Sequence, residues 1–291
     1  MTFSTLVRQR WVDLDAQAHV NNARILDYLQ EARVAWLHAG RQQALLGRSV
    51  VVVEHQIVYL ASVDVRDDGV EVDLGVGRVR ASQFELGYDV RAGGSLVAQA
   101  RTRMCYVDPE TGRPAPAPVD ARAWFQEQSS TLARVPDLGG WRVGSRAHRH
   151  PVTVRWSDID AYRHVNNVTY FDYVAEARIA LNRTVVADAI TLGGPGSTEH
   201  RWLVARQDIR YLTEMVHRIE PYQVRTAVAS VGRTSLRLIA EIVDADTATV
   251  FARTATVLVH ADPAGRPSPV PEALRTAADR WPAVPHRRRV A

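Results

Sequence analysis

A long internal repeat constrains the fold of this chain more than any other feature of its sequence. The segment Trp11–Leu37 recurs as Trp156–Asn182, 145 positions further on, and both segments contain the run His-Val-Asn-Asn followed by Glu-Ala-Arg. This period is far above the roughly 20–50 residues of solenoid repeats, so it predicts two copies of a domain. The length of 291 residues is enough for two domains of ordinary size.

Each copy has the same predicted order of secondary-structure elements. In the first copy, a short strand near Leu6–Val12 precedes a helix from about Asn22 to Ala39, and Gly40 is placed to end that helix. Apolar residues recur in the helix at spacings of three and four, which is typical of one buried face. The face consists of Ile25, Leu29, Ala32 and Trp36 in the first copy and of Tyr170, Val174, Ala177 and Leu181 in the second.

Four β-rich segments follow the helix in each copy, separated by Gly and Asp turns. They are Ser49–Leu60, Gly69–Val79, Gln83–Val90 and Leu96–Val107, and then Trp202–Leu212, Gln223–Val231, Ser235–Val243 and Ala248–His260. This pattern favours the α+β class, with an antiparallel sheet wrapped around the helix of each copy. We therefore expect a first domain at 1–113, a Pro-rich connector at 114–148 with a short helix near Asp120–Leu132, a second domain at 149–262 and a C-terminal extension at 263–291.

The composition excludes several classes of protein. Apolar residues make up 46% of the chain and charged residues 23%, which is typical of a globular protein. All 36 basic residues are arginine, but the net charge is only +4 and the arginines are interleaved with acids, so we expect no nucleic-acid partner. Cys105 is the single cysteine, and we expect no signal peptide and no membrane span. We expect a soluble, cytoplasmic protein.

The densest polar cluster of each copy lies between the first strand and the helix. It consists of Asp13, Asp15, His19, Asn21 and Asn22 in the first copy and of Asp158, Asp160, His164, Asn166 and Asn167 in the second. A helix N-terminus presents backbone N–H groups and the positive end of the macrodipole, which suit a developing oxyanion. A carboxylate beside such donors can attack a carbonyl carbon or activate water.

Each residue type in this cluster also has a purely structural interpretation. Asparagine is a preferred N-cap, aspartate forms turns, and histidine can satisfy the backbone of a loop. Capping is compatible with catalysis, because an N-terminus left partly open still points donors at whatever lies in front of it. The spacing Asp-x-Asp-x3-His lacks the paired histidines of common catalytic zinc sites, so we expect no metal.

The pattern Asp-x-Asp-x3-His-Val-Asn-Asn, followed by an amphipathic helix that carries Glu-Ala-Arg, resembles two groups of proteins. These are the hotdog-fold thioesterases of the 4-hydroxybenzoyl-CoA thioesterase type and the acyl-ACP thioesterases. The resemblance covers residues 3–108 and 151–262. It implies a double hotdog, in which two antiparallel sheets each wrap around a central helix. It also implies that the copies pack as an intramolecular pseudo-dimer, with a further homo-oligomer left open.

The same resemblance implies roles for individual residues. The catalytic carboxylate, as nucleophile or general base, falls on Asp15 and Asp160, with His19 and His164 beside it. The backbone amides that polarise the thioester oxygen fall on Val20, Asn21 and Asn22 and on Val165, Asn166 and Asn167. The acyl-ACP branch has an Asn where this chain has Gln17 and Tyr162. It also has a further acid, which aligns with Glu214 in the second copy and with Ser62 in the first.

Hydrolysis of an acyl-CoA thioester, in one or both copies and without a cofactor, is the leading hypothesis. Arginines on the outer surface would meet the CoA phosphates. An acyl-ACP thioesterase, acting on an acyl carrier protein, is one alternative. A non-catalytic acyl-CoA-binding or regulatory module is another, although a pure binder would not need Asp and His in both copies. The length of the acyl chain does not follow from these residues.

Overall fold

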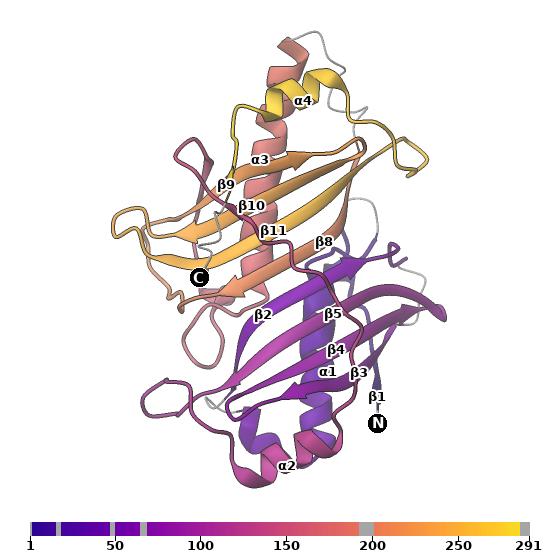
Figure 1. The fold of residues 1–291 in the computed structure, drawn as a ribbon, viewed down its shortest axis with the longest axis vertical. Helices are drawn as coiled ribbons and strands as arrows, with labels where there is room; N and C mark the ends of the chain where they lie inside the picture. The colour runs from indigo at the N-terminus through magenta and orange to yellow at the C-terminus, as the bar shows by residue number, and fades with distance from the viewer. Residues whose placement is uncertain (1, 16–18, 47–49, 65–68, 192–200, 286–291) are drawn as a thin grey trace. The chain divides into compact units, whose positions relative to one another are not determined.

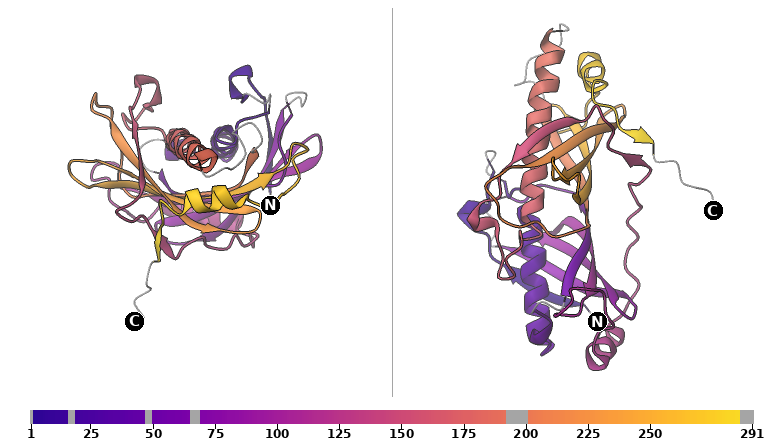
Figure 2. Two further views of the ribbon diagram at one scale, coloured as in Figure 1. Left: turned by 90° about the horizontal axis from the view of Figure 1, so that it is seen from above. Right: turned by 90° about the vertical axis from the view of Figure 1, so that its left-hand side faces the viewer.

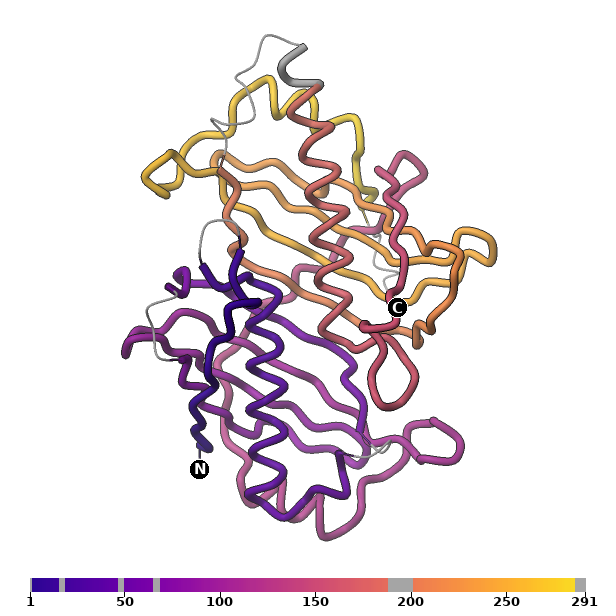
Figure 3. The backbone as a smooth tube through the Cα atoms, turned by 180° about the vertical axis from the view of Figure 1, so that it is seen from behind, coloured from indigo at the N-terminus to yellow at the C-terminus, as the bar shows by residue number. Residues whose placement is uncertain are grey.

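The computed structural model describes residues 2–15, 19–46, 50–64, 69–191 and 201–285 (Figure 1). The chain divides into two units, Met1–Pro136 and Asp137–Ala291. Each unit contains a five-stranded antiparallel set of strands with one long helix against a single face of that sheet (Figures 2 and 3). In the described part of the chain, no helix is both long enough and apolar enough to cross a lipid bilayer.

The first unit is built around helix α1 (Arg24–Ala39). Its strands are β1 (Phe3–Val7), β2 (Val50–Tyr59), β3 (Val70–Val79), β4 (Gln83–Ala92) and β5 (Ser95–Tyr106), in the spatial order β1-β3-β4-β5-β2. Shorter elements are η1 (Trp11–Asp13), η2 (Gln43–Leu46) and α2 (Val119–Glu127). The predicted apolar face of α1 is confirmed, because its four residues are each 3% exposed or less.

The second unit repeats this arrangement around helix α3 (Thr169–Thr191). Its strands are β7 (His148–Val152), β8 (Arg201–Tyr211), β9 (Tyr222–Val231), β10 (Ser235–Val243) and β11 (Val250–Ala261), in the order β7-β9-β10-β11-β8. The unit also contains η3 (Trp156–Asp158), α4 (Glu272–Ala278) and a two-stranded pair of β6 (Trp141–Arg142) with β12 (Val284–Pro285). The predicted face of α3 is buried as well.

The β-rich segments predicted after each helix are confirmed to within two residues at every end, but the predicted end of the first strand was wrong. The first strand ends at Val7 rather than Val12, because the Asp13 carboxylate accepts the Arg10 N–H at 2.8 Å and turns the chain there. Helix α1 begins at Arg24, two residues after the predicted start at about Asn22, because a separate turn at residues 21–24 precedes it.

Both short helices outside the expected domains pack into the units. Phe125 of α2 stacks on Phe84 of β4 with ring centroids 4.3 Å apart. Helix α4 takes the equivalent place in the second unit, and both helices start after a proline, Pro118 or Pro271, in the same extended conformation. The first unit therefore extends past residue 113 and the second past residue 262, where we had expected a connector and an extension to begin. The connector helix is also shorter than expected, ending at Glu127.

Candidate active site

The first aspartate of each motif supports the loop that leads into the long helix. Asp13 is 5% exposed, and its carboxylate accepts hydrogen bonds from the Arg10 N–H and the Tyr28 hydroxyl, both at 2.8 Å. In the second unit, Asp158 accepts the Arg155 N–H at 2.8 Å and the Tyr173 hydroxyl at 2.6 Å. Burial and these hydrogen bonds raise the pKa of Tyr28 and of Tyr173, so both hydroxyls remain donors at neutral pH.

The second aspartate of each motif faces its own short loop. Asp15 Oδ1 accepts the His19 N–H at 3.2 Å, and Asp160 Oδ1 accepts the N–H groups of Tyr162 at 2.8 Å and His164 at 3.4 Å. Asp160 Oδ2 accepts no hydrogen bond from any residue that the structure describes. One oxygen of this carboxylate thus positions the side chain, and the other has lone pairs for a substrate or a water molecule.

The two histidines have different surroundings. His164 Nε2 lies 3.0 Å from Glu214 Oε2, which follows β8. In the first unit, His19 forms a backbone bridge with Asp64. Val63 and Met215 mark equivalent positions, because their carbonyls accept the N–H groups of Val20 and Val165 respectively. Ser62 therefore stands where the second unit has Glu214, as the sequence alignment predicts.

Most backbone amides assigned to the oxyanion site already donate to backbone carbonyls. The Val20 N–H donates to Val63 O at 3.0 Å and the Asn21 N–H to Asp13 O at 2.8 Å. The same pattern recurs at Val165, which donates to Met215 O, and at Asn166, which donates to Asp158 O.

The Asn22 N–H makes no hydrogen bond with the described residues. Of the three amides assigned to the oxyanion site in the first unit, Asn22 is therefore the one whose N–H has no partner among the described residues. The first asparagine of each pair acts as a cap, because Asn21 Oδ1 accepts the Ala23 N–H at 3.0 Å and Asn166 Oδ1 accepts the Val168 N–H at 3.1 Å.

Sequence reasoning missed one repeated contact beside this amide. The Tyr59 hydroxyl donates to Asn22 O at 3.0 Å, and the Tyr211 hydroxyl donates to Asn167 O at 2.7 Å. Both tyrosines lie at the end of an equivalent strand, β2 or β8, within a short stretch that the two copies share. The shared stretch could have drawn attention to these tyrosines. It could not have predicted the partner of each hydroxyl, because that partner depends on the tertiary fold. These bonds fix the peptide unit that follows the candidate oxyanion donor.

The residue types gathered here suit acid–base chemistry with an anionic intermediate. In each loop the aspartate carboxylate accepts the backbone N–H of the histidine, and in the second unit the His164 imidazole also lies 3.0 Å from the Glu214 carboxylate. Gln17 lies outside the described residues. Among the residues that the structure describes, no three His, Cys, Asp or Glu side chains form a group that could hold a metal ion.

Three solved structures that resemble this chain along most of its length are described as thioesterases. A putative oleoyl thioesterase from Lactobacillus plantarum is 17% identical, with a TM-score of 0.70 over 93% of this chain and 98% of that one. The 12:0-ACP thioesterase from Umbellularia californica is 17% identical, with a TM-score of 0.67 over 89% and 94%. An acyl-ACP thioesterase from Bacteroides thetaiotaomicron VPI-5482 is 14% identical, with a TM-score of 0.64 over 89% and 97%. These likenesses establish a hotdog fold in each copy.

The family comparison reaches the same conclusion from the sequence. No curated protein matches the chain. A model of the thioesterase-like superfamily matches twice, at residues 9–125 and 154–278, and each match includes one long helix and the loop before it. The family and the fold together support thioester hydrolysis in general terms. The chain belongs to the thioesterase-like superfamily, as a tandem duplication of its domain.

Proposed function

We propose that the protein hydrolyses the thioester bond of an acyl-CoA to a free acid and CoA, and that the second unit carries the better equipped site. The observation that supports this proposal most is the arrangement around Asp160. One oxygen of its carboxylate accepts backbone N–H groups, and the His164 side chain from the same loop lies 3.0 Å from the Glu214 carboxylate. The first unit has the carboxylate and the histidine, but Ser62 replaces the acid.

In this proposal, Asp160 acts as a general base on a water molecule or as a nucleophile. In the first route, Oδ2 takes a proton from water while the water oxygen bonds to the thioester carbon. The carbonyl oxygen becomes an oxyanion that backbone amides at the start of the central helix stabilise. Collapse of the tetrahedral intermediate breaks the carbon–sulfur bond, and the proton goes to the departing CoA thiolate. His164, held by Glu214, orients the water or donates a hydrogen bond to the substrate.

Release of free thiol from acyl-CoA measures this activity directly. We expect turnover of at least one member of a panel of short, medium, long and aromatic acyl-CoA substrates. Asp160→Asn should lower kcat by at least about 100-fold, the scale of a general base. Glu176→Gln is the matched control, because this exposed carboxylate lies on α3 and has no assigned role. Unchanged turnover in Asp160→Asn would remove this residue from the mechanism.

The first unit is tested by the parallel substitution. Asp15→Asn should lower kcat less than Asp160→Asn does if the His164–Glu214 pair makes the second site the more active one. Glu31→Gln, on the exposed side of α1, is its control. If Asp15→Asn and Asp160→Asn lowered kcat equally, the two units would contribute equally to turnover.

An acyl-ACP substrate is the second candidate, favoured by one specific observation. Glu214 aligns roughly with the further acid of the acyl-ACP branch, and its carboxylate lies 3.0 Å from the His164 ring. Tyr162 departs from that branch, which has Asn there. The same acyl group presented on CoA and on an acyl carrier protein separates the two candidates by kcat/KM. Tight binding of acyl-CoA with no release of thiol from either carrier would favour a non-catalytic binding module.

A further inference from the structure

The loop that carries Glu214 contacts the Asp160 loop at several points. Met215 is fully buried, its N–H donates to the Tyr170 hydroxyl at 3.1 Å, and its carbonyl accepts the Val165 N–H at 2.8 Å. Two residues further on, the His217 ring packs edge-on against Trp156, with centroids 5.4 Å apart. Glu214 itself is 62% exposed, and an exposed ion pair contributes little by itself. The position of Glu214 therefore depends on what holds the rest of residues 212–221, which we call the Glu214 loop.

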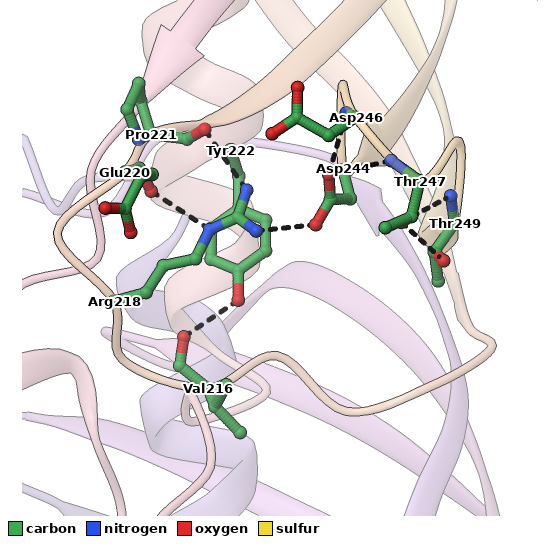
Figure 4. A network of polar contacts seen from close by, with 9 residues as sticks. All are labelled: Val216, Arg218, Glu220, Pro221, Tyr222, Asp244, Asp246, Thr247 and Thr249. Carbon is green, nitrogen blue, oxygen red and sulfur yellow. Dashed lines mark hydrogen bonds and ion pairs between the residues drawn. The ribbon is translucent and has the colours of Figure 1, made fainter.

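Arg218 holds the far end of the Glu214 loop (Figure 4). Its Nε donates to Glu220 O at 3.0 Å and its Nη2 to Pro221 O at 3.2 Å. Its Nη1 donates to Asp244 Oδ2 at 2.5 Å, across the turn between β10 and β11. The guanidinium lies 3.8 Å from the centroid of the Tyr222 ring. All three guanidinium nitrogens are thus used, and a cation–π contact adds to them.

The two side chains that contact Arg218, Asp244 and Tyr222, are themselves held in place. Asp244 is 7% exposed, and its Oδ1 accepts the N–H groups of Asp246 at 2.9 Å and Thr247 at 3.2 Å. Those backbone hydrogen bonds, together with Arg218, hold the pKa of Asp244 below its usual value, so the carboxylate is charged at neutral pH. The Tyr222 hydroxyl donates to Val216 O at 3.0 Å, which ties the start of β9 back to the Glu214 loop.

The first unit lacks this arrangement at the positions that the structure describes. Val70 stands where the second unit has Tyr222, because each is the first residue of its strand and pairs with the last residue of β1 or β7. Ala92 stands where the second unit has Asp244, at the end of the equivalent hairpin. Glu214, Tyr222 and Asp244 therefore occur in the same copy, and Ser62, Val70 and Ala92 replace them in the other.

We propose that Arg218 is a positioning residue for thioester hydrolysis. It fixes the Glu214 loop to the β10–β11 turn, and so keeps the Glu214 carboxylate against His164. This inference rests on the proposed function of the Asp160 site. Arg218 acts through Glu214 and does not touch the substrate.

Kinetics of Arg218→Ala test the inference against a purely structural role. We expect kcat to fall about 10-fold to 100-fold, the scale for a misplaced catalytic group, with little change in KM. Arg218→Lys keeps the charge but loses the planar fork, so it should recover only part of kcat. Arg225→Ala is the matched control. This substitution removes the ion pair between Arg225 and Glu241, whose side chains are 2.7 Å apart and about as exposed as those of Arg218 and Asp244. The pair does not touch the Glu214 loop, so Arg225→Ala should have near-normal kcat.

A double-mutant cycle shows whether Arg218 acts through Glu214. In a Glu214→Gln background, Arg218→Ala should cause no further loss of kcat. The inference is overturned if Arg218→Ala costs as much in that background as in the wild type, or if Arg225→Ala lowers kcat to the same extent.

Hydrogen exchange of the Glu214 loop provides a readout that does not need activity. The peptide spanning residues 212–221 should exchange faster in Arg218→Ala and in Asp244→Ala than in the wild type or in Arg225→Ala. Unchanged exchange in Arg218→Ala would show that Arg218 does not hold the loop, and would overturn the inference even in an active thioesterase. Faster exchange in a protein that releases no thiol from any carrier would instead refute the proposed function, and the positioning role would fall with it.

Discussion

Asp13 and Asp15 lie two residues apart, and the fold uses their carboxylates in opposite ways. Asp13 is buried and accepts a backbone N–H and a tyrosine hydroxyl, whereas Asp15 is exposed at the surface of its loop. In the second unit Asp158 and Asp160 are both half-buried, and their partners differ: Asp158 accepts the Tyr173 hydroxyl, whereas Asp160 accepts backbone N–H groups of its own loop. Both aspartates are equally prominent in the motif, so only their burial and partners distinguish a structural acid from a candidate catalytic one.

The tyrosine that bonds to the buried acid should contribute to stability. Tyr173→Phe removes a hydrogen bond to a carboxylate, which should lower the free energy of unfolding at pH 7 by about 1.5–3 kcal/mol. Urea unfolding measures this change. Tyr106→Phe is a suitable control, because no hydrogen bond of its hydroxyl is present among the described residues. A loss below about 0.5 kcal/mol in Tyr173→Phe would contradict the structural role of this pair.

The same tyrosines predict how stability depends on alkaline pH. The pKa values of Tyr28, Tyr170 and Tyr173 are raised, chiefly by burial, above the value of about 10 for an unfolded chain. Their contribution is therefore complete below about pH 10 and is lost as the pH rises further. The urea concentration at the unfolding midpoint should decrease when the pH is raised from 9 to 11. These pH values lie roughly one unit either side of the ordinary tyrosine pKa. Tyr173→Phe should make that decline shallower, and an identical slope in both proteins would count against it.

At the scale of elements, the two long helices differ in length because their surroundings differ. Helix α1 has 16 residues and α3 has 23. Trp124 of α2 stacks on Trp36 with centroids 4.5 Å apart and lies against Gly40, where α1 ends. In the second unit Val185 follows at the position equivalent to Gly40, and the helix continues past it.

Glycine at position 40 is required by this close approach. A Cβ atom there would lie 2.0 Å from Trp124 Cζ2, so Gly40→Ala should force the stacked rings apart and destabilise the first unit by about 1–3 kcal/mol. Gly75→Ala is the matched control, because a Cβ there would lie 3.6 Å from Leu132, at ordinary contact distance. Chemical denaturation of both variants checks the prediction. Equal stability of Gly40→Ala and the wild type would show that Trp124 moves away at no cost.

At the scale of the whole molecule, the duplicated chain contains two candidate sites whose residues differ. Both units keep the Asp-containing loop and the long helix, whereas the His164–Glu214 pair belongs to the second unit. The expected packing of the two copies as a pseudo-dimer stays a prediction. If the copies do pack together, heating should unfold the chain in a single transition whose calorimetric and van't Hoff enthalpies agree. Two separate calorimetric transitions, only one of them shifted by Gly40→Ala, would contradict this expectation.

The amino-acid sequence by itself determined the duplication, the helix faces, the β-rich segments and the place of the Asp15 and Asp160 loops. These features are legible because helix and strand periodicity are local, and because two copies of one motif show which residues recur. Only the tertiary structure decided that α2 and α4 belong to the units and which helix-start amides are used by the loop. It also decided that Arg218 meets Asp244, 26 residues away. Contacts between residues far apart in the sequence depend on the tertiary fold, and local periodicity does not predict them.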